Sequence, residues 1–140
     1  DGANIEIREQ VGAENIFIFG LQAHEVTSLK ARGYAPETFV ASNPDLARTL
    51  DMIDSGYFSP ANVFDGKPIV GRLLSDGEPF LVLADFAAYA RAQDEVDALY
   101  LQPDEWSRKA VLNALGMGTF SSDRSIREYA ERIWRIKPVL

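Results

Sequence analysis

Two short apolar runs constrain the fold of this chain more than any other feature. Residues 15–20 (NIFIFG) are a β-branched and aromatic run closed by glycine, and residues 80–83 (FLVL) are a second apolar run. Runs of this kind are typical of strands buried on both faces of a sheet. Such strands need neighbours on either side, and two short strands make a poor sheet alone. We therefore expect an α/β fold that this chain contains only in part.

Helical patterns account for most of the other residues. Apolar residues recur every three or four positions, and proline or glycine stands near several of the expected ends. These patterns predict helices near residues 5–11, 23–32, 44–55, 65–75, 86–102, 103–115 and 123–137, with a connector at 34–36. The expected fold class is α/β and mostly helical, with about two short strands and six or seven helices. We expect residues 1–140 to form a single unit.

Helix-capping residues mark two of the expected helix starts. Asp85 follows the second apolar run and is placed to cap the helix after it, while Ser121 precedes the last helix. Pro138 is expected to end that last helix. The chain also starts at Asp1 rather than at methionine, and its first residues already resemble the opening of a helix. We expect further sequence to precede it.

Charge and composition exclude several classes of partner. The net charge of -7 opposes the counterion release on which nucleic-acid binding relies, and it offers nothing to anionic membranes. The sequence has no apolar run of about 18 residues and no basic-then-apolar leader, so we expect a cytoplasmic protein. With no cysteine, the chain can form neither disulfides nor thiolate metal sites.

Two short motifs resemble functional sites. Residues 116–119 (GMGT) place two glycines before a helix, as phosphate-binding loops do, but the third glycine and the following lysine are missing. We interpret them as a turn between helices. Residues 121–124 (SSDR) combine hydroxyl, acid and cation without a histidine to activate a serine. Helix capping by the serines, and an ion pair or carbonyl contact of Arg124, are the preferred interpretation.

The remaining candidates are ordinary polar residues. His24 is the only histidine and has no evident partner to orient it as a base, so we expect a solvated helix residue. Asp94, Glu95 and Asp97 are neighbours in sequence that point to different faces of a helix, which favours a solvated acidic face over a metal or glycosidase site. No catalytic, cofactor-binding or metal-binding residue is predicted. The aromatic residues are expected to pack in a core, unless a stripe left uncovered marks a docking surface.

A family resemblance extends over essentially the whole chain. Residues 118–134 (GTFSSDRSIREYAERIW) closely resemble the end of the glycogen and maltodextrin phosphorylases. Further signatures follow in the expected order at residues 1–7 (DGANIEI), 14–20 (ENIFIFG), 56–60 (GYFSP), 83–89 (LADFAAY) and Gln93. Residues 116–119 and Ser125 depart modestly from the usual pattern. The chain resembles the carboxyl-terminal segment of an α-glucan phosphorylase.

The resemblance implies a large cytosolic enzyme, usually a homodimer, with two Rossmann-like lobes. Such enzymes use pyridoxal phosphate and orthophosphate to cleave α-1,4-glucan ends and release glucose 1-phosphate. The fold implied for this chain is an incomplete carboxyl-terminal part of the cofactor-bearing Rossmann-like lobe of a two-lobed glycosyltransferase-type fold. Its partner would be the remainder of the phosphorylase chain.

The family's Schiff-base lysine belongs to a Gly-Asn-Met-Lys motif that this sequence lacks. By family order that motif lies shortly upstream of Asp1, and the four lysines present (Lys30, Lys67, Lys109 and Lys137) stand in other contexts. The fragment is therefore predicted to be structural and inactive, with no cofactor bound. The alternative is a free-standing helical interaction module, suggested by an apolar stripe that includes Ile126, Ile133 and Trp134.

Overall fold

The computed structural model describes residues 2–59, 65–75 and 77–137. The chain divides into two compact units: unit 1 holds residues 1–18 and 95–140, and unit 2 holds residues 19–94. The α-helices of the described residues are α1 (Gly2–Val11), α2 (Ala23–Arg32), α3 (Pro36–Ser42), α4 (Pro44–Asp54), α5 (Lys67–Leu73), α6 (Val82–Tyr100), α7 (Pro103–Gly116) and α8 (Ser122–Glu128). Shorter helical segments are η1 (Ala13–Asn15) and η2 (Met117–Phe120), both 3-10, and the π-helical η3 (Tyr129–Trp134).

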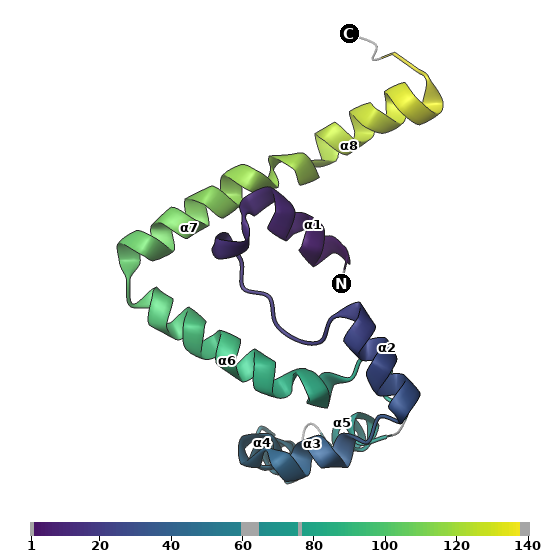
Figure 1. The fold of residues 1–140 in the computed structure, drawn as a ribbon, viewed down its shortest axis with the longest axis vertical. Helices are drawn as coiled ribbons and strands as arrows, with labels where there is room; N and C mark the ends of the chain where they lie inside the picture. The colour runs from purple at the N-terminus through teal and green to yellow at the C-terminus, as the bar shows by residue number, and fades with distance from the viewer. Residues whose placement is uncertain (1, 60–64, 76, 138–140) are drawn as a thin grey trace. The chain divides into compact units, whose positions relative to one another are not determined.

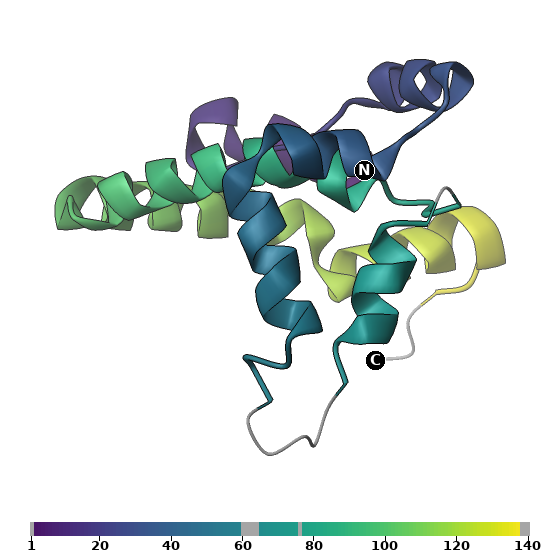
Figure 2. The same cartoon turned by 90° about the horizontal axis from the view of Figure 1, so that it is seen from below.

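Unit 2 is built around α4, whose sequence dictates both its start and its buried face. Pro44 occupies the first turn, where a missing N–H costs little, and the Asn43 side chain accepts hydrogen bonds from two first-turn N–H groups at 3.1 Å. Helix α5 lies beside α4 (Figure 2). The buried core of this unit consists of Leu46, Leu50, Val70 and Leu83. Partly buried apolar residues of α3 to α6 pack against it.

Unit 1 consists of α1, η1, the end of α6, and the helices from α7 to η3. Figure 1 shows α1 along α7, and Gly116 at the end of α7 allows this approach. A Cβ at Gly116 would stand 2.8 Å from Cγ1 of Val11. Val11 is the only buried apolar residue among the described residues of this unit. Its helices therefore leave most of their apolar side chains exposed.

The mostly helical character is confirmed, and the helix expected within residues 65–75 is present as α5 (Lys67–Leu73). Helix α3 was missed, because residues 34–36 were expected to be a connector. Pro36 starts that helix rather than interrupting a loop. The expected end at Pro138 lies outside the described residues.

The prediction of two strands is wrong for the described residues, which contain no strand and hence no Rossmann-like sheet. Ile16 is extended, with φ −143° and ψ 141°, yet no neighbouring strand pairs with residues 16–18. Residues 80–83 are instead a turn followed by the first turn of α6, because Leu81 adopts φ 55° and α6 begins at Val82. Asp85 consequently lies inside the helix rather than at its cap. No helix in the described part of the chain is both long and apolar enough to span a bilayer.

Candidate functional site

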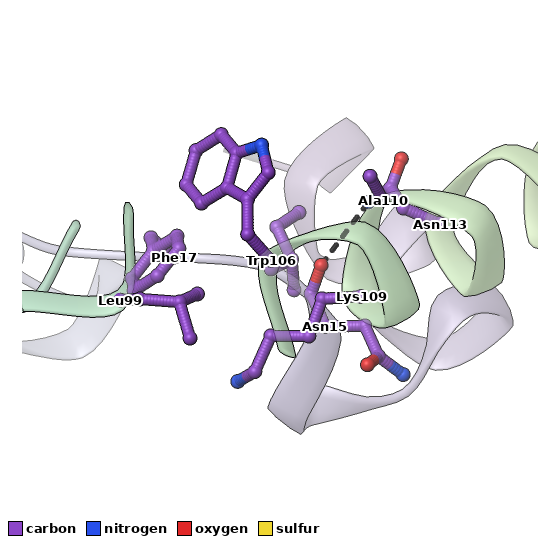
Figure 3. A pocket seen from close by; sticks show the side chains of 8 residues that line it. Asn15, Phe17, Leu99, Trp106, Lys109, Ala110 and Asn113 are labelled. Atoms are coloured by element: carbon purple, nitrogen blue, oxygen red, sulfur yellow. Dashed lines mark hydrogen bonds between the residues drawn. The ribbon is translucent and has the colours of Figure 1, made fainter. Parts of the chain in front are cut away.

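An apolar groove in unit 1 has a volume of about 400 Å³. It is formed where the chain leaves η1 and passes the end of α6 and one face of α7. Its lining residues are Asn15, Ile16, Phe17, Leu99, Trp106, Lys109, Ala110 and Asn113. Figure 3 shows these side chains around the groove. The spacing of 106, 109, 110 and 113 is that of one face of α7.

Hydrogen bonds from α7 hold η1 in place. Asn113 Nδ2 donates to the carbonyl oxygen of Asn15 at 3.2 Å (Figure 3). The Lys109 ammonium donates to the carbonyl of Glu14 and lies 5.9 Å from the centroid of the Phe17 ring, within the range of a cation–π contact. The two hydrogen bonds fix η1 against α7, and the cation–π contact places Phe17 beside it.

The side chains that line the groove are suited to binding an apolar surface. Its lining side chains include one amine and two amides, with no carboxylate and no imidazole to act as acid or base. The Asn15 side chain is buried, and in the described part of the chain its Oδ1 has no hydrogen-bond partner. The groove therefore presents mainly apolar side chains, with the Lys109 amine as its one basic group.

The glycines of residues 116–119 are explained by packing. Gly116 approaches α1, and residues 117–120 form η2 between α7 and α8, which is the expected turn. The Thr119 hydroxyl donates to the Gln10 side chain at 3.1 Å.

The motif at residues 121–124 is a helix cap, as expected. Ser121 Oγ accepts the Arg124 N–H at 3.3 Å at the start of α8. The Arg124 guanidinium donates to the carbonyl of Thr119 and pairs with Glu128. Both the capping interpretation of Ser121 and the contact interpretation of Arg124 are confirmed.

The other sequence candidates do not gather into a site. His24 is exposed in the first turn of α2, and Asp94, Glu95 and Asp97 are exposed on α6. Among residues 2–59, 65–75 and 77–137, no group of three or more His, Cys, Asp or Glu side chains could hold a metal ion.

Glu78 is a buried carboxylate that sequence reasoning missed. It is 5% exposed, and its two oxygens accept the N–H groups of Phe80 at 2.6 Å and Val82 at 3.0 Å. A second carboxylate, Asp85 in the first turn of α6, accepts the Leu21 N–H at 2.8 Å. A glutamate preceding a proline and an apolar run gives no periodic signal, so only the backbone geometry reveals its role.

Tyr34 lies close to these carboxylates in unit 2. Burial raises the pKa of its phenol above the ordinary value, and the negative charge of Glu78 raises it further. The backbone N–H groups of Leu83 and Ala84 lower the pKa, though less than burial raises it. The hydroxyl is buried with no hydrogen-bond partner of good geometry in the described residues.

Known proteins of one family match this chain over nearly its whole length. The sequence model of the family described as carbohydrate phosphorylase matches residues 1–136. The glycogen phosphorylase of Synechocystis sp. is 50% identical over 140 residues, covering 100% of this chain and 16% of the relative. That of Chlamydia pneumoniae is 45% identical over 136 residues, covering 97% of this chain and 16% of the relative. The brain form of glycogen phosphorylase from Homo sapiens is 44% identical over 138 residues, covering 99% of this chain and 16% of the relative. The chain thus spans about 16% of the length of these curated relatives.

Proposed function

Because the chain belongs to the carbohydrate phosphorylase family, we propose that it is the carboxyl-terminal segment of a glycogen or α-glucan phosphorylase. The observation that carries the proposal is the identity of 50% over all 140 residues with a glycogen phosphorylase. Placement at the carboxyl terminus is supported by the resemblance of residues 118–134 to the end of the glycogen and maltodextrin phosphorylases.

The proposed activity of the whole protein is phosphorolysis, a glycosyl transfer to orthophosphate in carbohydrate metabolism. The bond between C1 of the terminal glucose and the glycosidic oxygen breaks, and a phosphate oxygen forms the new bond to C1. The glycosidic oxygen takes up a proton as it becomes the hydroxyl of the shortened glucan. The products are glucose 1-phosphate and a glucan shorter by one residue. We propose a cytoplasmic homodimer that uses pyridoxal phosphate, as the family resemblance implies.

We propose that the described residues do not bind pyridoxal phosphate on their own. An imine with the cofactor needs a lysine amine that is available to react, and two of the four lysines are engaged elsewhere. The Lys30 ammonium donates to the carbonyl of Pro79 at 3.0 Å, and that of Lys109 donates to the carbonyl of Glu14. Lys67 and Lys137 are exposed, outside the groove. We therefore propose that the chain alone is structural and inactive.

We propose that residues 1–140 are a single unit that forms the carboxyl-terminal part of a Rossmann-like, cofactor-bearing lobe. Residues 16–18 support this proposal, because their backbone makes no hydrogen bond with the backbone of another described residue and Ile16 is already extended. In the whole protein these residues would pair as a strand. The exposed apolar faces of unit 1 would be covered by the remainder of the chain, which is the proposed partner. A free-standing interaction module is not favoured, because the family match extends over residues 1–136.

Two experiments test this proposal. Sequencing of the gene upstream of the Asp1 codon is expected to show several hundred further codons that include a Gly-Asn-Met-Lys motif. A start codon immediately before the Asp1 codon would contradict the assignment to a larger enzyme.

Separately, purified chain incubated with pyridoxal phosphate is expected to show no more imine absorbance than free lysine at the same amine concentration, and a saturable imine band that borohydride reduction fixes to one lysine would contradict the proposed lack of cofactor binding.

A further inference from the structure

We propose that hydrogen bonds to the Glu78 carboxylate hold residues 80–83 as a helix start and keep them from adopting the extended conformation. We call this pair of hydrogen bonds the latch. The segment is a place where sequence and structure disagree. Phenylalanine, leucine and valine in this order favour a strand, yet the chain turns at Leu81 and enters α6 at Val82. Something outside the segment must stabilise the turn.

The turn has a strained residue at its centre. Leu81 has φ 55°, a conformation that side chains other than glycine, asparagine and aspartate rarely adopt. Its carbonyl accepts the N–H groups of Ala84 at 3.0 Å and Asp85 at 3.3 Å, so it occupies the capping position of α6. A leucine side chain has no oxygen to accept the remaining first-turn N–H groups. This position therefore lacks the usual means of capping a helix.

Glu78 supplies the missing acceptor from three residues upstream. One carboxylate oxygen accepts the N–H that precedes Leu81 and the other accepts the N–H that follows it, at 2.6 and 3.0 Å. The two bonds bracket Leu81 and leave it little freedom to relax. The negative charge also lies at the amino end of a 19-residue helix, where the helix dipole favours it.

The exposed fractions of the side chains at residues 80–83 indicate that the latch opposes an extended conformation. Leu81 and Leu83 are 1% and 3% exposed, whereas Phe80 and Val82 are 78% and 46% exposed. Alternation of buried and exposed side chains is the pattern of a strand with one covered face. The segment thus keeps a strand-like pattern of burial while its backbone is held as a turn. Without the latch, extension of residues 80–83 would relieve the strain at Leu81.

Amide exchange and carbon chemical shifts of the 140-residue chain test this proposal with Glu78→Gln. The amide group retains the shape of the side chain but presents only one acceptor oxygen. We expect exchange at Phe80 and Val82 to rise by about 2- to 30-fold, the range expected for loss of a helix cap. The Cα shifts of Leu81 and Leu83 should move toward extended values. Glu78→Ala should produce a larger change in the same direction.

Asp104→Asn is the matched control, because Asp104 is an exposed acid in the first turn of α7. It should leave exchange at Phe80 and Val82 unchanged. Unchanged exchange and shifts in Glu78→Gln would overturn the proposal. An equal rise of exchange across the buried residues of α4 would also overturn it, because Glu78 would then be a general stabiliser. If Glu78→Ala fails to fold, the glutamine variant still decides between these results.

Discussion

Gly66 lies where the start of α5 meets the backbone of α4. A Cβ at this position would stand 2.1 Å from the carbonyl oxygen of Ile53, which is closer than atoms can approach. Backbone atoms cannot move aside as a flexible side chain can, so Gly66→Ala must separate the two helices. We expect the free energy of unfolding to fall by about 1–3 kcal/mol, as for overpacked cores.

Gly71→Ala is the matched control for this prediction, because nothing lies within 4 Å of its Cβ and the residue is inside α5. Alanine should be neutral there, or stabilising by up to about 1 kcal/mol through its helix propensity. Chemical denaturation of both variants measures the difference. Equal stability of the two would show that α5 does not approach α4 as described.

Tyr34 makes the stability of unit 2 depend on pH in the alkaline range. Because burial raises its pKa in the folded state above 10.0, the unfolded state loses the phenol proton first as pH rises. The unfolded state then binds fewer protons than the folded state, so stability falls with pH from about 10 until the folded phenol also ionises. Below that range the phenol is protonated in both states and contributes no pH dependence.

Tyr34→Phe should remove this alkaline loss of stability. The measurement is the free energy of unfolding at pH 8 and at pH 11 for both proteins, together with the phenolate absorbance. The difference between the two absorbance titrations isolates Tyr34 from the other four tyrosines. A Tyr34 titration below pH 10 would contradict the burial of the hydroxyl.

At the scale of elements, the sequence predicted the helices better than the strands. Periodicity and proline positions located α4 and α7, because both signals are local to the helix. Strands at residues 15–20 and 80–83 would need partner strands, which the described residues do not contain, and no local pattern shows whether a partner is present. The segment after Pro79 also depends on Glu78, whose capping role arises from a turn at Leu81 that propensity does not predict.

The candidate groove could not be predicted from the sequence. It forms because Asn113 and Lys109 of α7 hold η1 in place, and both contacts join residues more than ninety positions apart. Hydrophobic periodicity indicates which face of α7 is apolar, but it does not indicate what packs against that face. The cap at Ser121 was predictable because it involves residues three positions apart.

Gly116→Ala tests the packing of α1 on α7. The added Cβ would stand 2.8 Å from Val11 Cγ1 and 3.0 Å from the carbonyl of Gln10, so the helices must move apart. We expect the gain in helix propensity to be outweighed, with a net loss of about 1–2 kcal/mol. Amide exchange in α1 should rise. Gly118→Ala, with nothing within 4 Å, should leave it unchanged, and similar exchange in both variants would contradict the close approach.

At the scale of the whole molecule, the chain leaves much of its apolar surface uncovered. Ile126, Ile133 and Trp134 of the last helical segments are 54%, 64% and 54% exposed. Stable monomeric proteins rarely leave large apolar patches open to solvent. We therefore expect the isolated chain to bind a hydrophobic dye or to associate with itself.

Ile133→Lys should lower dye binding or self-association without changing helical content, because the side chain packs in no described core. Ser107→Lys, at an exposed and uncharged residue of α7, adds the same single positive charge and is the matched control. Light scattering of a monomer with no dye binding by the unmodified chain would contradict this prediction.

We propose that residues 1–140 contain no active site of their own. The most direct measurement is the release of glucose 1-phosphate from maltodextrin and orthophosphate by the purified chain, with pyridoxal phosphate added. A complete glycogen phosphorylase serves as the positive control. We predict no release above a protein-free blank. Phosphate-dependent release that grows with the concentration of the 140-residue chain would contradict the account.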